Sequence, residues 1–447
     1  AIGRLALDAN TTASNNVAVG YNSLGANTGG TPNIGIGTDA GVSITTGNRN
    51  IAIGAYAVDA VTTTHYNIGI GDNALGATTG NGNVGIGDAA LKSTTTAGYN
   101  VGIGFEAAKA NTTASYNVAV GAASFVDNTT GAHNVAIGAD ALGNNTTAAN
   151  NTAIGSSALY ANTTGTESVA VGRSALAANT TGSQNVAVGH GALDANTTAG
   201  YNTAVGYIAL SANTTGAQNN AFGAGSLDAN TTGAYNTAMG HDSLGANTTA
   251  SSNTAFGHSS LLLNSTGDNN TAVGLNSLDA NTTGSSNTAV GVHALGGNTT
   301  ADNNVAVGYN ALKANTSGTD NIAMGHNSLT ANSTGNDNTA VGDQALSTNA
   351  TTNSNTALGS GALATNVGSN NVGVGASALT ANTTANNNVA VGTNSLSGNT
   401  TGGSNTAVGH DALVANTTGA NNIGIGVSTL DANTTAHDNV AIGNSAM

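Results

Sequence analysis

The chain has no cysteine and no tryptophan, a single proline, and charged side chains at only 6% of its 447 positions. Without cysteine, neither disulfide bonds nor cysteine-ligated metal centres can stabilise a fold. The 6 lysines and arginines stand against 21 aspartates and glutamates, which leaves a net charge of −15. Because nucleic-acid binding needs a basic face for the phosphates, this composition argues against nucleic acid as a partner.

Long apolar runs are missing as well. No segment is apolar over the length needed to span a membrane, and no signal peptide is recognisable. The sequence begins at Ala1, and both of its ends fall inside a repeat unit. We therefore interpret it as a segment of a longer fibre. The lack of cysteine is compatible with an extracellular location in which stability comes from stacking alone.

Glycine, by contrast, is abundant and regularly placed. The stretch Asn185–Tyr201, NVAVGHGALDANTTAGY, recurs along the whole chain. The glycine at its fifth position has 27 copies from Gly3 to Gly443, separated by 24 intervals of 17 residues and two of 16. A period near 20 residues indicates a solenoid, and apolar residues at fixed positions argue against disorder. We predict one continuous repeat array over residues 1–447, forming one elongated body.

The segment from Asn185 to Gly189 predicts a short β-strand, because valine and isoleucine alternate with small residues. Its second position is valine or isoleucine, replaced by threonine in nine copies. Its fourth position is apolar in all 27 copies, which predicts that this side chain faces a dry core. Its third position is always alanine or glycine and should face the other way, in close contact with another chain.

The second half of the repeat carries leucine in 22 of 27 copies and asparagine at the following turn in 22 of 26. Asparagine, glycine and threonine favour turns. Both 16-residue intervals are shortened in this turn region. We predict two strands and two turns per repeat, and hence an all-β parallel β-solenoid, or β-roll, of about 27 turns with a 17-residue repeat.

The N-x-A-x-G motif, seen as NVAVG at Asn16–Gly20 and NIGIG at Asn33–Gly37, resembles the head repeats of trimeric autotransporter adhesins. Similar repeats occur in bacteriophage tail fibres and other surface fibres. The resemblance implies a homotrimer of parallel β-rolls, left-handed in the adhesin heads. Two features depart from that family: the repeat is longer, and neither a coiled-coil neck nor a membrane anchor is present in the sequence.

Residues that could take part in catalysis or ligand binding are scattered along the chain and do not form a motif. Five histidines directly follow the repeat glycine, and two of them, His241 and His258, should stack on consecutive turns. Tyr99 and Tyr116 should stack in the same way, as could Tyr201 and Tyr235. No paired carboxylates and no calcium-binding repeat accompany them. We predict no catalytic, cofactor-binding or metal-binding residues, no cofactor, and no enzyme activity.

Two alternatives concern the Asn-Thr-Thr turns. They form N-x-[ST] sequons, for example at Asn10, Asn111, Asn196 and Asn433, although turn chemistry alone explains these residues. A flat threonine face would indicate ice binding, whereas threonines confined to turns would favour a fibre. We predict an extracellular structural or adhesive fibre shaft on a cell or virion surface, self-associating as parallel chains. Cell-surface glycans or receptors are further candidate partners, and the alternative function is an ice-binding or glycan-binding solenoid.

Overall fold

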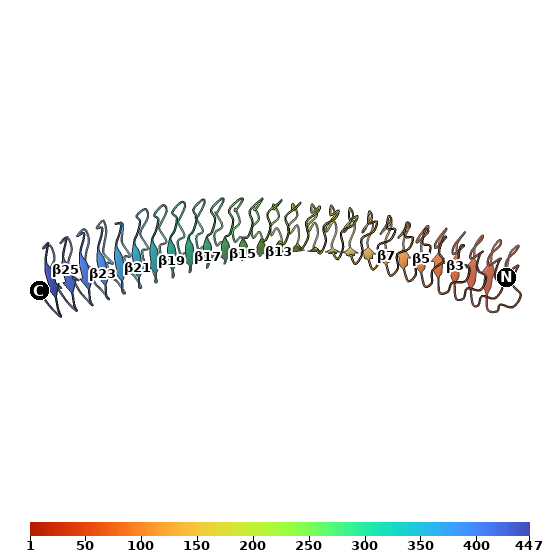
Figure 1. Ribbon diagram of the computed structural model, residues 1–447, viewed down its shortest axis with the longest axis horizontal. Coiled ribbons are helices and arrows are strands. Elements are labelled where there is room, and N and C mark those ends of the chain that lie inside the picture. Colours follow the sequence, from red (N-terminus) through yellow and green to blue (C-terminus); the bar gives the residue numbers. More distant parts are fainter. The chain divides into compact units, whose positions relative to one another are not determined.

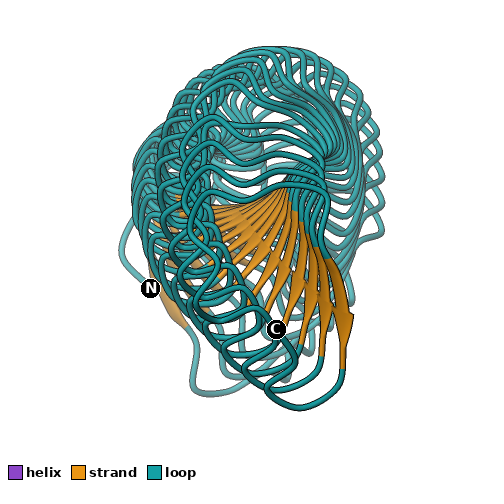
Figure 2. Ribbon diagram, turned by 90° about the vertical axis from the view of Figure 1, so that its left-hand side faces the viewer, coloured by secondary structure: helices purple, strands orange, loops and turns teal.

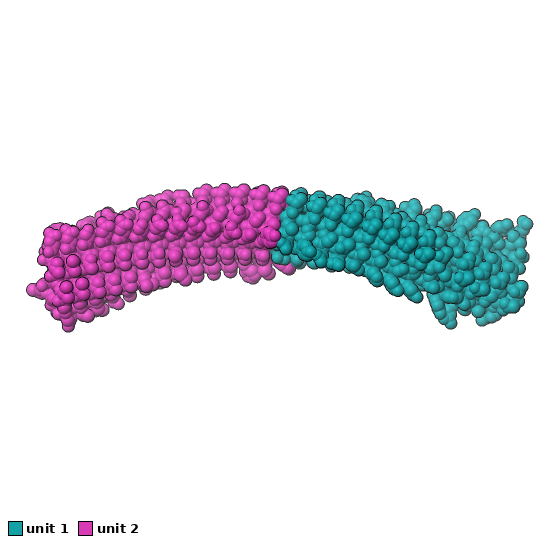
Figure 3. All heavy atoms as spheres, in the orientation of Figure 1, with its two compact units in different colours: residues 1–221 teal, residues 222–447 magenta.

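A computed structural model describes all 447 residues as two compact units, residues 1–221 and 222–447 (Figure 3). Both units contain the same parallel β-solenoid, without helices, as the repeat predicts. Each 17-residue turn contributes one strand of three residues. The strands are β1 (Val17–Val19), β2 (Ile34–Ile36), β3 (Ile51–Ile53), β4 (Ile68–Ile70), β5 (Val84–Ile86), β6 (Val101–Ile103), β7 (Val118–Val120), β8 (Val135–Ile137), β9 (Thr152–Ile154), β10 (Val169–Val171), β11 (Val186–Val188), β12 (Thr203–Val205), β13 (Asn220–Phe222), β14 (Thr237–Met239), β15 (Thr254–Phe256), β16 (Thr271–Val273), β17 (Thr288–Val290), β18 (Val305–Val307), β19 (Ile322–Met324), β20 (Thr339–Val341), β21 (Thr356–Leu358), β22 (Val372–Val374), β23 (Val389–Val391), β24 (Thr406–Val408), β25 (Ile423–Ile425) and β26 (Val440–Ile442).

Within each unit, every strand pairs in parallel with the equivalent strand of the next turn (Figure 1). Val169 lies opposite Val186, for example, one repeat further along the chain. The 16-residue repeats keep this register, since Ile68 of β4 lies opposite Val84 of β5. The missing residue is therefore absorbed in the turn, as predicted. Figure 2 shows the strands gathered on one side of the coil, with turns forming the remaining sides.

The leucine segment is not a second strand, and the prediction of two strands per turn is wrong. Leu193 has φ 53° and Gly191 has φ 64°, so left-handed residues stand on both sides of Ala192. An L-residue such as leucine pays about 1–2 kcal/mol for this conformation. The segment is nevertheless held between turns, because the Leu193 amide donates to the Ala209 carbonyl at 3.1 Å and the Gly191 amide to the Arg173 carbonyl at 3.0 Å.

The glycine that closes each strand is required by its backbone. Gly189 has φ 137°, a region that side chains rarely adopt. A Cβ atom there would lie 2.2 Å from the carbonyl oxygen of Gly206 on the next turn. Equivalent conflicts recur along the repeat, which explains why this glycine is present in all 27 copies.

The strand residues face the opposite way from the prediction. The central residue, such as Ala187, is fully buried inside the coil, whereas Val186 and Val188 point outward. The interior is too narrow for larger strand side chains, because a Cβ at Gly35 would lie 2.5 Å from Ser23 Oγ and 2.8 Å from Leu24 Cγ. Alanine and glycine therefore occur at this position because the core leucines of the same chain leave no room for a larger side chain. They do not form a contact between chains.

Two rows of asparagines fill the rest of the interior. Asn162 is fully buried, and its Nδ2 donates both to Asn145 Oδ1 at 3.0 Å and to the Gly165 carbonyl at 2.9 Å. Asn151, which precedes its strand, donates from Nδ2 to the same Gly165 carbonyl at 2.9 Å. Buried amides are tolerated only when their hydrogen bonds are satisfied. Here the neighbouring turns supply those partners.

Candidate functional surface

The most extensive candidate surface is the outer side of the strands, which we call the outer strand face and define as the first and third residues of each strand. On it lie large apolar side chains that are partly exposed. Ile36 is 38% exposed, Met324 42%, Leu358 47% and Phe256 53%. Since the fourth repeat position is apolar in every copy although it faces outward, burial inside the chain does not explain its composition.

Charge is absent from the outer strand face. The chain has 27 charged residues, 6 basic plus 21 acidic, yet none occupies an outer position of the 26 strands. Threonine replaces the first residue in nine strands and asparagine in β13. A contiguous apolar surface of more than a few hundred Å² marks an interaction site in soluble proteins. The sequence analysis missed this face because it assigned the invariant apolar position to the core.

Aromatic and histidine side chains form short stacks beside the strands, as predicted. The rings of His241 and His258 stack with centroids 5.2 Å apart, and those of Tyr99 and Tyr116 stack at 5.5 Å. His133 extends the second stack, with its ring centroid 5.2 Å from that of Tyr116. Because ring stacks of this kind present mainly their edges to solvent, they offer few free faces for a ligand. Tyr201 and Tyr235 belong to different units.

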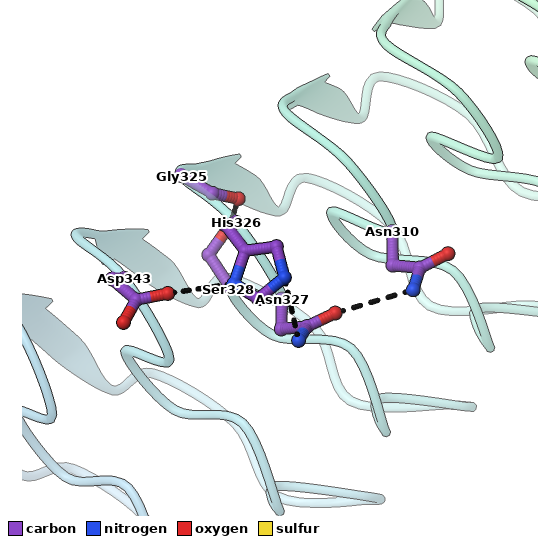
Figure 4. Close-up of polar contacts among 6 residues, drawn as sticks. All are labelled: Asn310, Gly325, His326, Asn327, Ser328 and Asp343. Carbon is purple, nitrogen blue, oxygen red and sulfur yellow. Dashed lines mark hydrogen bonds and ion pairs between the residues drawn. The ribbon is translucent and has the colours of Figure 1, made fainter.

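The surroundings of His326 show how these side chains are used (Figure 4). Its Nδ1 lies 2.8 Å from Asp343 Oδ1 on the following turn, and its ring stacks on Tyr309 at 5.7 Å. Asn327 contacts His326 Nε2 at 3.2 Å and accepts a hydrogen bond from Asn310 at 3.2 Å. These contacts link neighbouring turns. No group of three or more histidine or acidic side chains is placed to hold a metal ion.

A row of aspartates follows the leucine position. Burial raises the pKa of Asp59, Asp194, Asp228 and Asp279 above the ordinary value, and hydrogen bonds from nearby backbone amides oppose this rise. For Asp59 the charge of Asp39 adds to the increase in pKa, whereas the charge of His293 lowers the pKa of Asp279. The carboxylates lie on separate turns, so the pattern is that of partly buried surface acids.

A hollow interrupts the regular surface at the turns that precede the first strands of unit 1. It is an open groove of about 510 Å³. Arg49 donates from Nη1 to the Tyr66 hydroxyl at 2.8 Å, and its guanidinium carbon lies 5.4 Å from the centre of that ring. The residues that line this groove show no periodic pattern in the sequence, which is why they were not predicted as a site. The groove is lined by Ser14, Asn15, Thr31, Pro32, Asn48, Arg49, His65 and Tyr66.

The threonine pairs lie in turns, and they do not form a flat strand face. The first threonine of a pair is tied to the next turn, as when Thr163 Oγ1 donates to the Thr180 carbonyl at 3.0 Å. The second, such as Thr164, lies in the bend that precedes Gly165. Within the sequons, Asn111 and Asn196 are fully buried with their amides hydrogen-bonded, so a glycan cannot be attached to them in the folded chain. Turn and core chemistry therefore accounts for these residues.

Comparison with models of known protein families gives no match, and no curated protein matches the sequence. The structure has no helix long and apolar enough to cross a lipid bilayer. The fold places the chain in the class of tandem-repeat parallel β-solenoids.

Proposed function

We propose that this chain is the shaft of an extracellular structural or adhesive fibre with no catalytic role, similar to autotransporter adhesin heads and phage tail-fibre repeats. The observation that carries the proposal is the uniform bonding between turns. Strand, leucine segment and Asn-Thr-Thr turn each donate backbone hydrogen bonds to a neighbouring turn, and this pattern repeats throughout both units. A chain built in this way resists separation of its turns and leaves few segments free to move.

The distribution of titratable groups supports a structural role. Catalytic acid–base groups work as converging sets in a cleft. Here the histidines and aspartates lie singly or in pairs along the surface, as with the stacked His241 and His258, and the Asp-linked His326 is about half exposed. The threonine pairs of the Asn-Thr-Thr segments also lie in turns, and the threonines of the outer strand face alternate with apolar side chains, an arrangement that favours a fibre over an ice-binding surface.

We propose further that the working form is a homotrimer of parallel chains on a cell or virion surface. The resemblance of the N-x-A-x-G repeats supports this number. Sedimentation equilibrium tests the oligomer: a mass three times that of the chain is expected, and a monomer at all concentrations would contradict it. Antibody labelling of intact cells or particles of the source organism tests the location, with label expected on the outside before any permeabilisation.

The groove beside Tyr66 favours glycan binding as a second candidate function. A tyrosine that is 55% exposed, beside an arginine and several amide and hydroxyl groups, combines an apolar platform with polar donors. A glycan array probed with the intact chain and with Tyr66→Ala tests this candidate. Signals that disappear in the variant are expected, whereas an array without signals, or with equal signals, would refute it. Tyr235→Ala, which alters a tyrosine outside the groove, is the matched control.

A further inference from the structure

We infer that the outer strand face is the surface by which copies of this chain associate, so that the strands of one copy pack against the strands of another. The inference rests on the proposed self-associating fibre and names its interface. It replaces the expectation that the alanine and glycine positions lie between chains, because Ala187 and its equivalents are fully buried inside their own coil.

The size of the face is sufficient. With strands about 4.8 Å apart and three residues spanning about 10 Å, the 12 strands of unit 1 present on the order of 600 Å². Unit 2 carries a face of similar size from β14 to β26. A standard stable interface buries about 800 Å² on each partner, so one unit alone approaches this value.

The regular spacing of side chains on the outer strand face determines which kind of partner can fit it. Two outward side chains recur at every turn, at the spacing of hydrogen-bonded strands. A partner of irregular shape could match only a few of these turns. A second copy has the same spacing and can meet each turn equivalently, as paired sheets do when their side chains interdigitate.

The charge distribution also fits a second copy. Two chains that each carry a net charge of −15 repel one another, and a shared surface must therefore keep its acids away. All 21 acidic residues lie outside the outer strand positions. The sizes of the outward side chains in unit 2 also suit a second copy. Met239, Phe256 and Leu358 share their strands with a smaller threonine, which leaves room for an opposing side chain.

The test introduces charge on alternate turns of the face in the full chain. Ile103→Glu, Ile137→Glu and Val171→Glu together should convert the oligomer to a monomer in sedimentation equilibrium. The control is Thr113→Glu, Thr147→Glu and Thr181→Glu, which places the same charges on the exposed second threonine of the same three turns. The control should keep the mass of the unaltered chain. If the unaltered chain is an oligomer and the face variant keeps its mass, the interface is overturned while the proposed fibre stands.

A labelling experiment covers the case in which the charged variant does not fold. Because the chain has no cysteine, a single introduced cysteine is the only thiol that a maleimide can label. Val188→Cys should react with a maleimide at least 10-fold more slowly in the native oligomer than in denaturant, whereas Thr198→Cys should react at once. Equal native rates at both positions would overturn the interface. A monomeric unaltered chain would overturn both this interface and the proposed homotrimer.

Discussion

At the scale of the residue, the fold depends on backbone conformations that most amino acids avoid. Gly189 and its equivalents occupy φ near 130–140° against a carbonyl group of the next turn, while Leu193 and its equivalents hold left-handed conformations in the core. The glycines are irreplaceable for steric reasons, whereas the leucines are retained because their side chains fill the interior.

Replacing Gly189 with alanine should destabilise the chain by at least about 1–3 kcal/mol, the usual range for a strained backbone conformation. The new Cβ would also meet the Gly206 carbonyl oxygen at 2.2 Å, which forces the turns apart. Urea unfolding followed by fluorescence of the tyrosines measures the loss. Gly191→Asn is the matched control, because Asn22 and Asn73 adopt the same left-handed conformation at equivalent positions. A variant at Gly189 as stable as the control would refute the steric explanation.

Asp59 gives a prediction about pH. Burial is the main cause that raises its pKa above the ordinary value of 3.8, so the folded chain binds this proton more tightly than the unfolded chain. Its contribution to stability is therefore present below pH 3.8 and is lost as the pH rises through the raised pKa. Asp59→Asn removes this loss. Urea midpoints measured from pH 3 to 7 should show the variant gaining relative to the unaltered chain as the pH rises, and a constant difference would contradict the prediction.

At the scale of the element, the buried asparagine row is a cooperative ladder and not a set of independent contacts. Asn162 donates to Asn145 and accepts from Asn179, both at 3.0 Å. Near the start of the chain the same position holds Ile44 and Val61, which are buried without polar partners. Amide, aliphatic and, at Thr78 and Thr94, hydroxyl side chains are thus all accommodated at this position of the interior.

A single interruption of that ladder should be costly. Asn162→Val leaves Asn145 Oδ1 buried without its donor, and Asn179 Nδ2 loses one of its two acceptors while it keeps the Gly182 carbonyl. A buried polar atom left without a partner costs about 1–3 kcal/mol. Hydrogen exchange should show faster amides on the turns around residue 162 and little change near residue 400. Val61→Ile, which stays within the aliphatic stretch, is the control and should leave exchange unchanged. Equal effects of the two substitutions would contradict the ladder.

The repeat, the parallel register and the position of the Asn-Thr-Thr turns could be predicted from the sequence, because these follow from the spacing and from turn-forming residues. The prediction placed the strand residues on the wrong sides, since it took the invariant apolarity of Val188 and its equivalents as a sign of burial. An invariant apolar residue indicates contact with another apolar surface, but it does not show whether that surface belongs to the same chain or to another chain. The single strand per turn was also missed, because leucine rarely adopts the left-handed conformation of Leu193.

At the scale of the whole molecule, each turn interacts only with its neighbours, so the chain behaves as a stack of nearly equivalent units. Stability should then depend on the number of complete turns and on the continuity of their register. The 16-residue repeats at β4–β5 and β21–β22 show that a turn can lose one residue without a change of register. Larger deletions test whether the complete 17-residue turn is the structural unit.

Removal of Asn185–Tyr201 joins Gln184 to Asn202 and deletes one complete turn. The alanine, leucine and asparagine rows then continue, and stability in a thermal melt should fall only by the share of one turn. Removal of Asn185–Ala192 deletes about half a turn and should be far more damaging, since it sets the strand of one turn against the bend of the next. If both deletions behave alike, the 17-residue period is not the structural unit.

The shortness of the strands has a consequence for spectroscopy. Only three residues of each repeat have strand geometry, and left-handed residues recur in the remainder. The optical activity of left-handed backbone opposes that of right-handed backbone, so the far-ultraviolet circular dichroism of the native chain should be weak and lack a strong β-sheet signature. By that measure alone the protein would be classed as unstructured. Its amide protons, bonded from turn to turn, should nevertheless exchange as slowly as those of a rigid core.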